Sequence, residues 1–195
     1  QLLLARQLVK SLARDHGLMA SFMPKPRVDQ PGNGLHVHLS LTDATGADRM
    51  TDAGHPDMLS RTASDMIAGL LKHAPAQAAL GCSTVNSYLR LRPGSWAPAH
   101  VSWGVGNRGV LVRVPSREAP IHIEYRAGDA SSNLYLHVAG LLAATLDGLA
   151  TSPVLPPATG GEVLTWTDDE ATAHGVDRLP TCLDEALEAL RRDAF

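Results

Sequence analysis

The sequence predicts an α+β domain in which helices back a mostly antiparallel, curved sheet, and three observations support this fold class. Residues 35–41 alternate strictly between apolar and polar side chains, as a half-buried strand does. Further alternating stretches follow between residues 86 and 126, and Gly or Pro turns separate them. Stretches of helical periodicity precede and follow these strands. This order of elements is typical of helices packed on an antiparallel sheet.

The N-terminal part is predicted to hold one helix and one strand. Over residues 2–16, leucines recur every fourth position on one face of a helix that Gly17 can end. Residues 18–23 are then interpreted as a strand, which ends at the Pro-Lys-Pro of residues 24–26. A tight loop at residues 29–34, Asp-Gln-Pro-Gly-Asn-Gly, leads into the next strand.

That next strand, residues 35–41, has the sequence Leu-His-Val-His-Leu-Ser-Leu. Its apolar residues fall on one face, and His36, His38 and Ser40 fall on the other. Two histidines two positions apart therefore point the same way. Neutral imidazole is a common metal ligand. The alternative is an antiparallel strand that shows polar residues to water.

The middle of the chain is predicted to hold a loop, a helix and four strands. Residues 42–56 are polar and contain two glycines, as a surface loop does. A helix follows from Pro56 to about His73, and Pro75 breaks it. Alternation then returns in four stretches, at residues 86–92, 100–105, 110–114 and 121–126.

The C-terminal part is predicted to hold two helices with a loop between them. A long apolar helix over residues 132–150 is capped by a serine at 131 or 132. Residues 152–161 are rich in Pro and Gly and form the loop. The last helix ends near residue 192, and Thr181 with Asp184 resembles a capping box at its start.

Composition limits the possible classes of protein. The 195 residues are 44% hydrophobic and 19% charged, with a net charge of −3, which gives no general attraction to nucleic acid or membrane. Cys82 and Cys182 are isolated, which suits a reducing, cytoplasmic location. No run reaches the length of a membrane span, and no signal peptide is visible. The chain begins at Gln1 inside a helical pattern, so we expect a piece of a longer protein.

The polar faces of the predicted strands are rich in Arg and His and carry no Lys. Arginines crowded on one face repel each other unless an anion or an acidic partner lies among them. We therefore interpret this face as an anion-binding concave surface, with a solvated or subunit-contact face as the alternative. Its members are His36, His38, Ser40, Tyr88, Arg90, Arg92, His100, Arg113, His122, Glu124 and Arg126.

A metal is the next expectation. Glu124 is the one carboxylate at these strand positions, and with His36 it offers oxygen and nitrogen ligands. Such a site beside a phosphate favours Mg²⁺ or Mn²⁺, whereas two or three histidines would favour zinc. Divalent metal, phosphate and arginine together indicate phosphoryl transfer, with ATP as a candidate substrate. No Walker glycine-rich loop is present, so a nucleotide site here is not a P-loop.

At these residues the chain resembles the catalytic domain of the glutamine synthetase family, and the resemblance covers nearly all of residues 1–195. The matching segments are Phe22-Met23-Pro24-Lys25-Pro26, Gly32 to Ser40, Asn86 to Gly94, Asn107-Arg108 with Arg113-Val114-Pro115, and Ile123 to Arg126 with Asp129, Asn133 and Tyr135. The resemblance implies a cytoplasmic ligase of nitrogen metabolism that joins ammonia or an amine to glutamate with ATP and Mg²⁺ or Mn²⁺. It also implies a ring-like homo-oligomer for the full-length protein.

The resemblance assigns a role to each matching residue. His36 and Glu124 resemble ligands of the metal nearest the γ-phosphate, and His38 with Ser40 resembles the ATP-binding pair. Gly32 lies where the backbone meets glutamate. The arginines divide between the substrates: Arg90 and Arg126 resemble those that hold glutamate, Arg113 one that neutralises phosphate, and Arg108 one that does both.

Departures from the family pattern concern the metal, the flap and the ends of the chain. The family's other metal-binding glutamates and its β-grasp domain lie outside this sequence, so we expect residues 1–195 alone to bind metal weakly and not to turn over. His122 stands where the family often has Arg. Trp96 replaces the flap acid beside Ala-Pro that helps bind ammonium, so an organic amine is a candidate substrate in place of ammonia. The alternatives are a non-catalytic homologue, or a His-x-His metal protein unrelated to ATP.

Overall fold

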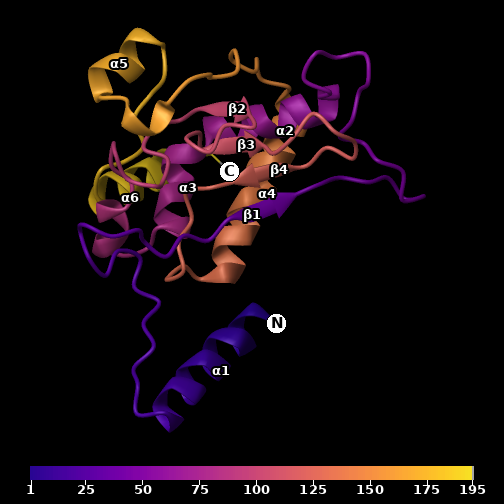
Figure 1. The fold of residues 1–195 in the computed structure, drawn as a ribbon. Coiled ribbons are helices and arrows are strands. Elements are labelled where there is room, and N and C mark those ends of the chain that lie inside the picture. The colour runs from indigo at the N-terminus through magenta and orange to yellow at the C-terminus, as the bar shows by residue number, and fades with distance from the viewer. Residues whose placement is uncertain (195) are drawn as a thin grey trace.

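The computed structural model describes residues 1–194, which form an α+β arrangement around a four-stranded mixed sheet (Figure 1). The strand order is β1-β4-β3-β2. In chain order the elements are α1 (Leu2–Asp15), β1 (Val37–Leu39), α2 (Arg61–Lys72), α3 (Ala74–Gly81), the 3-10 helix η1 (Val85–Leu89), β2 (Trp103–Val105), β3 (Val112–Val114), β4 (Ile123–Tyr125), α4 (Leu134–Thr151), the 3-10 helix η2 (Val163–Thr165), α5 (Asp168–Ala173) and α6 (Leu183–Arg192).

The sheet is mostly antiparallel, as the sequence predicts, but one of its pairings is parallel. β4 pairs antiparallel with β1 on one side and with β3 on the other, whereas β2 and β3 run parallel. Parallel neighbours need a connection that crosses back along the sheet. Residues 106–111 suffice here because each strand is only three residues long. The short connection between the two strands therefore does not form a hairpin.

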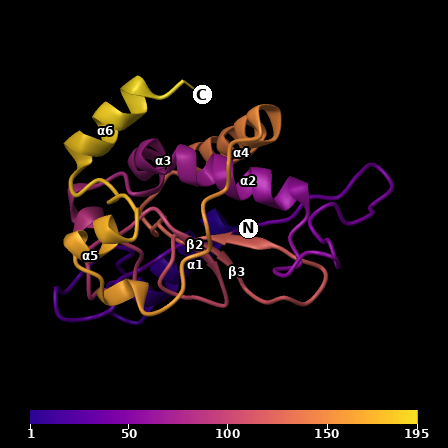
Figure 2. The ribbon, with the colours of Figure 1, turned by 90° about the horizontal axis from the view of Figure 1, so that it is seen from above.

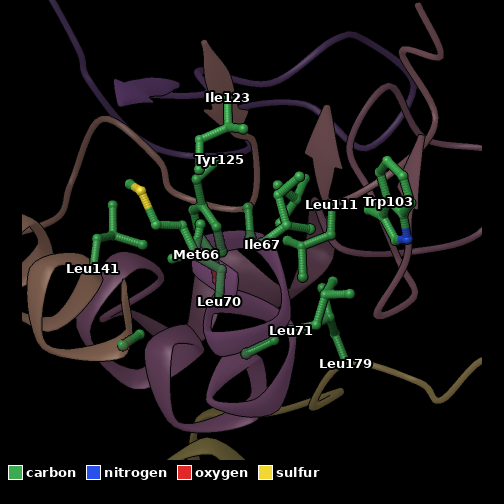
Figure 3. Close-up of a cluster of buried hydrophobic side chains, with 14 of the residues drawn as sticks. Met66, Ile67, Leu70, Leu71, Trp103, Leu111, Ile123, Tyr125, Leu141 and Leu179 are labelled. Carbon is green, nitrogen blue, oxygen red and sulfur yellow. The ribbon is translucent and has the colours of Figure 1, made fainter. Parts of the chain in front are cut away.

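Helices cover one face of the sheet, and the core lies between the two layers. Figure 2 shows α2, α3 and α4 on the same side of β2 and β3. Ile123 and Tyr125 of β4 point from the sheet toward Ile67 and Leu70 of α2 (Figure 3). Residue 124, between two buried apolar neighbours, must face the other way. The packing of β4 therefore fixes the direction of its one carboxylate.

α2 and α4 cross with their backbones in contact. A Cβ atom at Gly69 would meet the backbone oxygen of Ala144 and come within 2.8 Å of Gly148 Cα. A Cβ at Gly148 would meet the backbone oxygen of Asp65. Both positions therefore need glycine, because a close approach of two backbones leaves no room for a side chain.

The helix boundaries follow local signals, although not always the predicted ones. The Ser60 side chain caps α2 by accepting a hydrogen bond from Ala63 N–H. Pro75 does end the predicted helix, yet it also lies in the first turn of α3, where proline is tolerated. Asn133, and neither of the predicted serines, caps α4. At α6 the predicted capping box is wrong, because Thr181 pairs with the carboxylate of Glu185.

Two predicted strands are absent from the described residues, and two α-helices, α3 and α5, were not predicted. Residues 18–23 form no strand, and most of their side chains are exposed. Residues 85–89 form η1 because Thr84 and Ser87 cap each other and close a helical turn. Of the two unpredicted helices, α5 begins with a capping box of Thr167 and Glu170.

Two helices keep exposed apolar faces. α1 has no buried residue and lies apart from the other elements (Figure 1). α4 is long and apolar enough to cross a membrane by length and composition, so the expectation that no run reaches that length is wrong. Length and composition do not separate it from a core helix, and 33% of it is buried, against α2 among others.

Candidate functional site

The candidate site centres on Glu124, whose buried carboxylate lies among positive and imidazole groups. Its Oε1 is 2.7 Å from His36 Nδ1 and 2.8 Å from an Nη of Arg126. Its Oε2 is 3.0 Å from an Nη of Arg113. Burial by itself would raise the pKa of Glu124, but the Arg113 hydrogen bond and the charge of Arg126 outweigh it and hold that pKa below its usual value. Glu124 is therefore an anion at neutral pH.

The strand register brings these side chains together. Glu124 of β4 lies directly opposite His38 of β1 and opposite Arg113 of β3, and cross-strand partners share a face. Arg126 is two residues beyond Glu124, so it points to the same side. The face opposite the core thus gathers groups from three strands, as their alternation predicts.

His36 lies just before β1 and is held as a neutral base. Burial lowers its pKa first, and the charge of Arg126 lowers it further, while Glu124 acts in the opposite direction. Its Nδ1 contacts Glu124, and its Nε2 faces Gly34. A neutral imidazole is the form that ligates metal ions. Among the described residues, however, no group of three or more His, Cys, Asp or Glu side chains is placed to hold a metal.

The donor set at this point fits a divalent cation only in part. One imidazole nitrogen and one carboxylate are suitable donors for Mn²⁺ or Mg²⁺. Two arginines already occupy the oxygens of Glu124, and Mg²⁺ normally requires six oxygen-type ligands including water. His36 and Glu124 therefore form two ligands of a site that needs more from elsewhere.

Two further histidines flank the carboxylate. His38 Nε2 is 3.9 Å from Glu124 Oε1, and its ring centroid is 5.1 Å from that of His122. Ser40 lies just beyond the end of β1, with an exposed side chain. His38, His122 and Ser40 thus lie at the border of the site with solvent.

Arg90 lies beside a cavity of about 220 Å³ that adjoins His36. One terminal nitrogen of its guanidinium donates hydrogen bonds to the carbonyl oxygens of Ala127 and Gly128. The other terminal nitrogen lies close to Gly34, which also lines the cavity. A Cβ at Gly32 would meet Pro24 O and the Arg90 side chain, so only glycine allows this approach. The free edge of a rigid guanidinium is suited to a carboxylate.

Arg108 and Arg113 line a second, open hollow of about 710 Å³ on the other side of Arg126. The Arg108 side chain is exposed, and its backbone oxygen accepts a hydrogen bond of 2.9 Å from Arg126. Arg113 reaches from this hollow to Glu124. Each of the two hollows therefore carries cations and adjoins a group bound to Glu124.

Trp96 borders the smaller cavity and is 77% exposed. An indole ring that large is rarely left so open to solvent. Its neighbour Ser95 is tied back to the carbonyl oxygen of Arg90. The aromatic face of Trp96 is consequently available to whatever enters beside Arg90.

Three residues predicted for this face lie elsewhere. Tyr88 is buried in the core, because η1 replaces the expected strand, and its hydroxyl lies 3.4 Å from the carbonyl oxygen of Ala78. His100 is buried and contacts Asp168 at 3.2 Å. Arg92 is exposed beside a different hollow.

The sequence reasoning missed Lys25, which lines the cavity beside Arg90. Lys25 is buried, its Nζ donates a 2.6 Å hydrogen bond to Gln30 O, and its backbone is held on both sides by the Asn86 amide. A lysine is almost never fully buried without a reason. Its place between two prolines, as one of only three lysines, was the available signal.

Comparison with known proteins places this geometry in a family. The family model described as glutamine synthetase, catalytic domain, matches residues 1–195. The glutamine synthetase of Thermococcus kodakarensis is 44% identical over 189 residues, and that of Thermotoga maritima is 41% identical over 187. These alignments cover 96% and 95% of this chain but only 42% of each relative.

Solved structures agree with the sequence comparison. Apo GmaS without ligand has a TM-score of 0.83 at 34% identity, covering 97% of this chain and 42% of that one. A GmaS/ADP complex has a TM-score of 0.85 at 33% identity, covering 96% of this chain and 43% of that one. Since the family model spans the whole sequence and the solved structures share its fold, the chain belongs to the glutamine synthetase catalytic-domain family.

Proposed function

We propose that the longer protein of which this chain forms part joins ammonia or an amine to the γ-carboxylate of glutamate at the cost of ATP. The observation that carries the proposal is the carboxylate of Glu124, bound by His36, Arg113 and Arg126 between two arginine-lined hollows. Family membership supplies the reaction class. The ADP complex of a similar structure supports a nucleotide substrate.

In this proposal each hollow takes one substrate. Arg90 and Gly32 bind glutamate in the smaller cavity, and Arg126 lies between that cavity and the larger hollow. His38, Ser40 and Arg113 bind ATP, and Arg108 contacts both substrates. His36 and Glu124 contribute ligands to a Mg²⁺ or Mn²⁺ ion, which when bound screens the charge of the phosphates. The remaining ligands come from outside residues 1–195.

The chemistry then has two steps. A γ-carboxylate oxygen of glutamate attacks the terminal phosphorus of ATP, and the bond from that phosphorus to the bridging oxygen of ADP breaks. The amine nitrogen next attacks the acyl carbon, phosphate leaves, and the nitrogen loses a proton. Fixed arginines stabilise the charge that moves between these oxygens, because they need no reorganisation during the reaction.

The proposal is tested on the full-length protein by measuring phosphate release that depends on glutamate, ATP and an amine. We expect Arg108→Ala to lower kcat/KM by about a hundredfold or more, as loss of a transition-state cation does. Arg117→Ala is the matched control, since Arg117 is exposed and pairs with Asp57 at 2.7 Å away from the site. A protein that folds but releases no phosphate with any amine is a non-catalytic homologue, and the proposal then fails.

Trp96 favours a second candidate, an organic amine in place of ammonia. Its exposed indole beside the smaller cavity can bind an alkylammonium or aryl amine through cation–π and apolar contact. It carries no charge to attract ammonium and cannot accept a proton. Comparison of kcat/KM for ammonium, ethanolamine, polyamines and anilines tests this candidate. If ammonium is the best substrate and Trp96→Glu does not raise its relative rate, ammonia is the substrate.

Residues 1–195 by themselves are expected to bind metal weakly and not to turn over, and the full-length protein is expected to assemble as a ring-like homo-oligomer in the cytoplasm. Two protein ligands plus water seldom hold Mg²⁺ or Mn²⁺ firmly. Calorimetric titration of Mn²⁺ into the chain and into the full-length protein checks the first expectation. Tight, stoichiometric binding by the chain alone would show that the ligands are assigned wrongly.

A further inference from the structure

His137 is a buried imidazole that fills a slot between two glycines. It projects from α4 and is fully buried. A Cβ atom at Gly81 would lie 2.6 Å from its Cε1, and a Cβ at Gly128 would lie 2.5 Å from its Nε2. Real Cβ atoms do not approach other atoms so closely. The ring therefore sets the distance between α3 and the segment that follows β4.

Gly128, on one side of this slot, binds Arg90, a residue of the candidate site. Its carbonyl oxygen accepts hydrogen bonds from Arg90 at 2.6 Å and from the Leu35 N–H at 2.8 Å. The next residue, Asp129, donates its N–H to Gly81 O at 3.0 Å. A shift of Gly128 would thus move the acceptor on which the Arg90 guanidinium rests.

The imidazole acts through its shape. Neither ring nitrogen of His137 has a hydrogen-bond partner among the described residues. Burial lowers the pKa of His137 to about 4, so the ring is neutral near pH 7. A neutral, flat ring packed against two backbones resists compression, because protein interiors are close-packed.

We infer that His137 is a positioning residue for the glutamate-binding arginine, which it acts on by holding the carbonyl oxygen of Gly128 against Arg90. The inference rests on the proposed function for its kinetic consequence. Arg90 is buried, and one of its terminal nitrogens is committed to this carbonyl and to that of Ala127. The orientation of the other nitrogen toward the cavity therefore depends on where Gly128 lies.

The kinetic test uses the full-length protein and separates the KM for glutamate from kcat. In His137→Ala we expect the glutamate KM to rise roughly fivefold or more, while kcat and the ATP KM stay within about twofold, since the binding of one substrate is weakened equally in the ground state and the transition state. Gly128→Ala should act likewise, because its methyl group displaces the ring. In the double variant the methyl group occupies space that the ring has left, so the glutamate KM should fall below that of Gly128→Ala, a non-additive result that direct coupling requires.

Gly140→Ala is the matched control on the same helix. Its Cβ would meet the ends of the Leu80 and Gln77 side chains, which can move, and it lies one turn from His137. We expect an unchanged glutamate KM. If Gly140→Ala raises the glutamate KM as much as His137→Ala, or if the two slot substitutions are additive, His137 has only a general packing role and the inference is wrong.

A readout independent of activity keeps this inference separate from the proposed function. Hydrogen exchange of the Leu35 amide, which shares the Gly128 carbonyl with Arg90, should speed up by roughly tenfold in His137→Ala. Exchange at Val112, whose amide is bonded to Ser102 O in the sheet, should not change. If wild-type protein lacks glutamate-dependent activity the proposed function fails, whereas unchanged exchange at Leu35 overturns the inference.

Discussion

Two clusters in this chain combine a histidine, a carboxylate and arginine, but their burial is opposite. In the first, the Glu124 side chain is 4% exposed, whereas that of His36 is 37% exposed. In the second, the His100 side chain is fully buried, and its partner Asp168 is 63% exposed. Arg178 completes the second cluster, 2.9 Å from Asp168.

The difference decides what each cluster can do. A buried carboxylate must keep cations beside it, and among the groups bound to Glu124, Arg113 lines the larger hollow while His36 lines the smaller cavity beside Arg90. That cluster therefore presents positive charge to anything that enters. In the second cluster the acid is exposed, so water can replace it. His100 and Arg178 both contact Asp168 at the start of α5, and Arg178 also donates a hydrogen bond to Ala99 O. These contacts link the start of α5 to residues 99–100. Similar residue types thus give a binding face in one place and a structural link in the other.

The largest expected effect that tests this difference between the two clusters is at Glu124. We expect Glu124→Ala to lower the free energy of unfolding by about 3–5 kcal/mol, because it leaves Arg113 and Arg126 without their buried counter-ion. Urea denaturation measures the change. Glu188→Ala is the control, since the Glu188 side chain on α6 is 46% exposed and its ion pairs with Arg191 and Arg192 should contribute less than about 1 kcal/mol. An equal loss in both variants would mean that burial of the carboxylate is unimportant.

His137 extends the comparison of the buried histidines. Like His100 it is buried, but unlike His100 it has no hydrogen-bonding contact with a carboxylate among residues 1–194. Its pKa lies at about 4 in the folded protein, against 6.5 when unfolded. The unfolded state therefore takes up the proton first, and the stability is complete above pH 6.5 and is lost as the pH falls toward 4. The difference corresponds to about 3 kcal/mol.

Urea denaturation of wild-type protein and of His137→Leu between pH 7 and pH 4 isolates this contribution. The free energy of unfolding of wild-type protein should fall more steeply with decreasing pH than that of His137→Leu. The difference between the two proteins should shrink as the pH approaches 4. Parallel curves would contradict the neutral, buried assignment. For His100 the pKa is also lowered by burial, but Asp168 opposes the change, so its contribution should be smaller.

Within the second cluster the larger effect should come from the arginine. Arg178 donates hydrogen bonds to the backbone oxygens of Ala99 and Leu91 and forms an ion pair with Asp168. We expect Arg178→Ala to cost about 2 kcal/mol, as loss of charged hydrogen bonds to buried acceptors does. Arg178→Lys should recover only part of this, because an ammonium cannot reproduce the planar fork. Full recovery by lysine would show that charge alone is required.

The smallest effect should follow Asp168→Ala. Its carboxylate is mostly exposed, so the ion pair with Arg178 should contribute about 1 kcal/mol or less. Thermal unfolding in low and high salt measures it, and the small difference should shrink as salt screens the pair. A loss as large as that of Glu124→Ala would remove the distinction between the two clusters.

Strand alternation predicted most of the candidate site because the alternating residues of β1, β3 and β4 do form strands in the fold. Glu124 and Arg126, two residues apart, necessarily share a face, and the apolar neighbours of Glu124 fix which face that is. His36 and His38 follow the same rule. The α+β class and the mostly antiparallel sheet also follow from this local pattern.

The remainder depended on contacts that the local pattern does not contain. Residues 86–92 alternate like a strand, yet the Thr84–Ser87 cap closes a 3-10 turn, which sends Tyr88 inward and leaves Arg90 at the cavity. His100 matched the polar pattern, but only the fold places it against Asp168. The direction of β2 relative to β3 depends on the path of a short connection. The slot around His137 joins three segments that are distant in sequence.

The crossing of α2 and α4 also determines which glycines of these helices can be replaced during evolution. At Gly69 the obstacles to a side chain are backbone atoms of α4, so no second substitution on that helix can make room. At Gly140 the obstacles are the ends of Gln77 and Leu80, which a smaller neighbour would remove. One glycine is therefore fixed for as long as the helices cross as they do. The other can be replaced along a two-step path through α3.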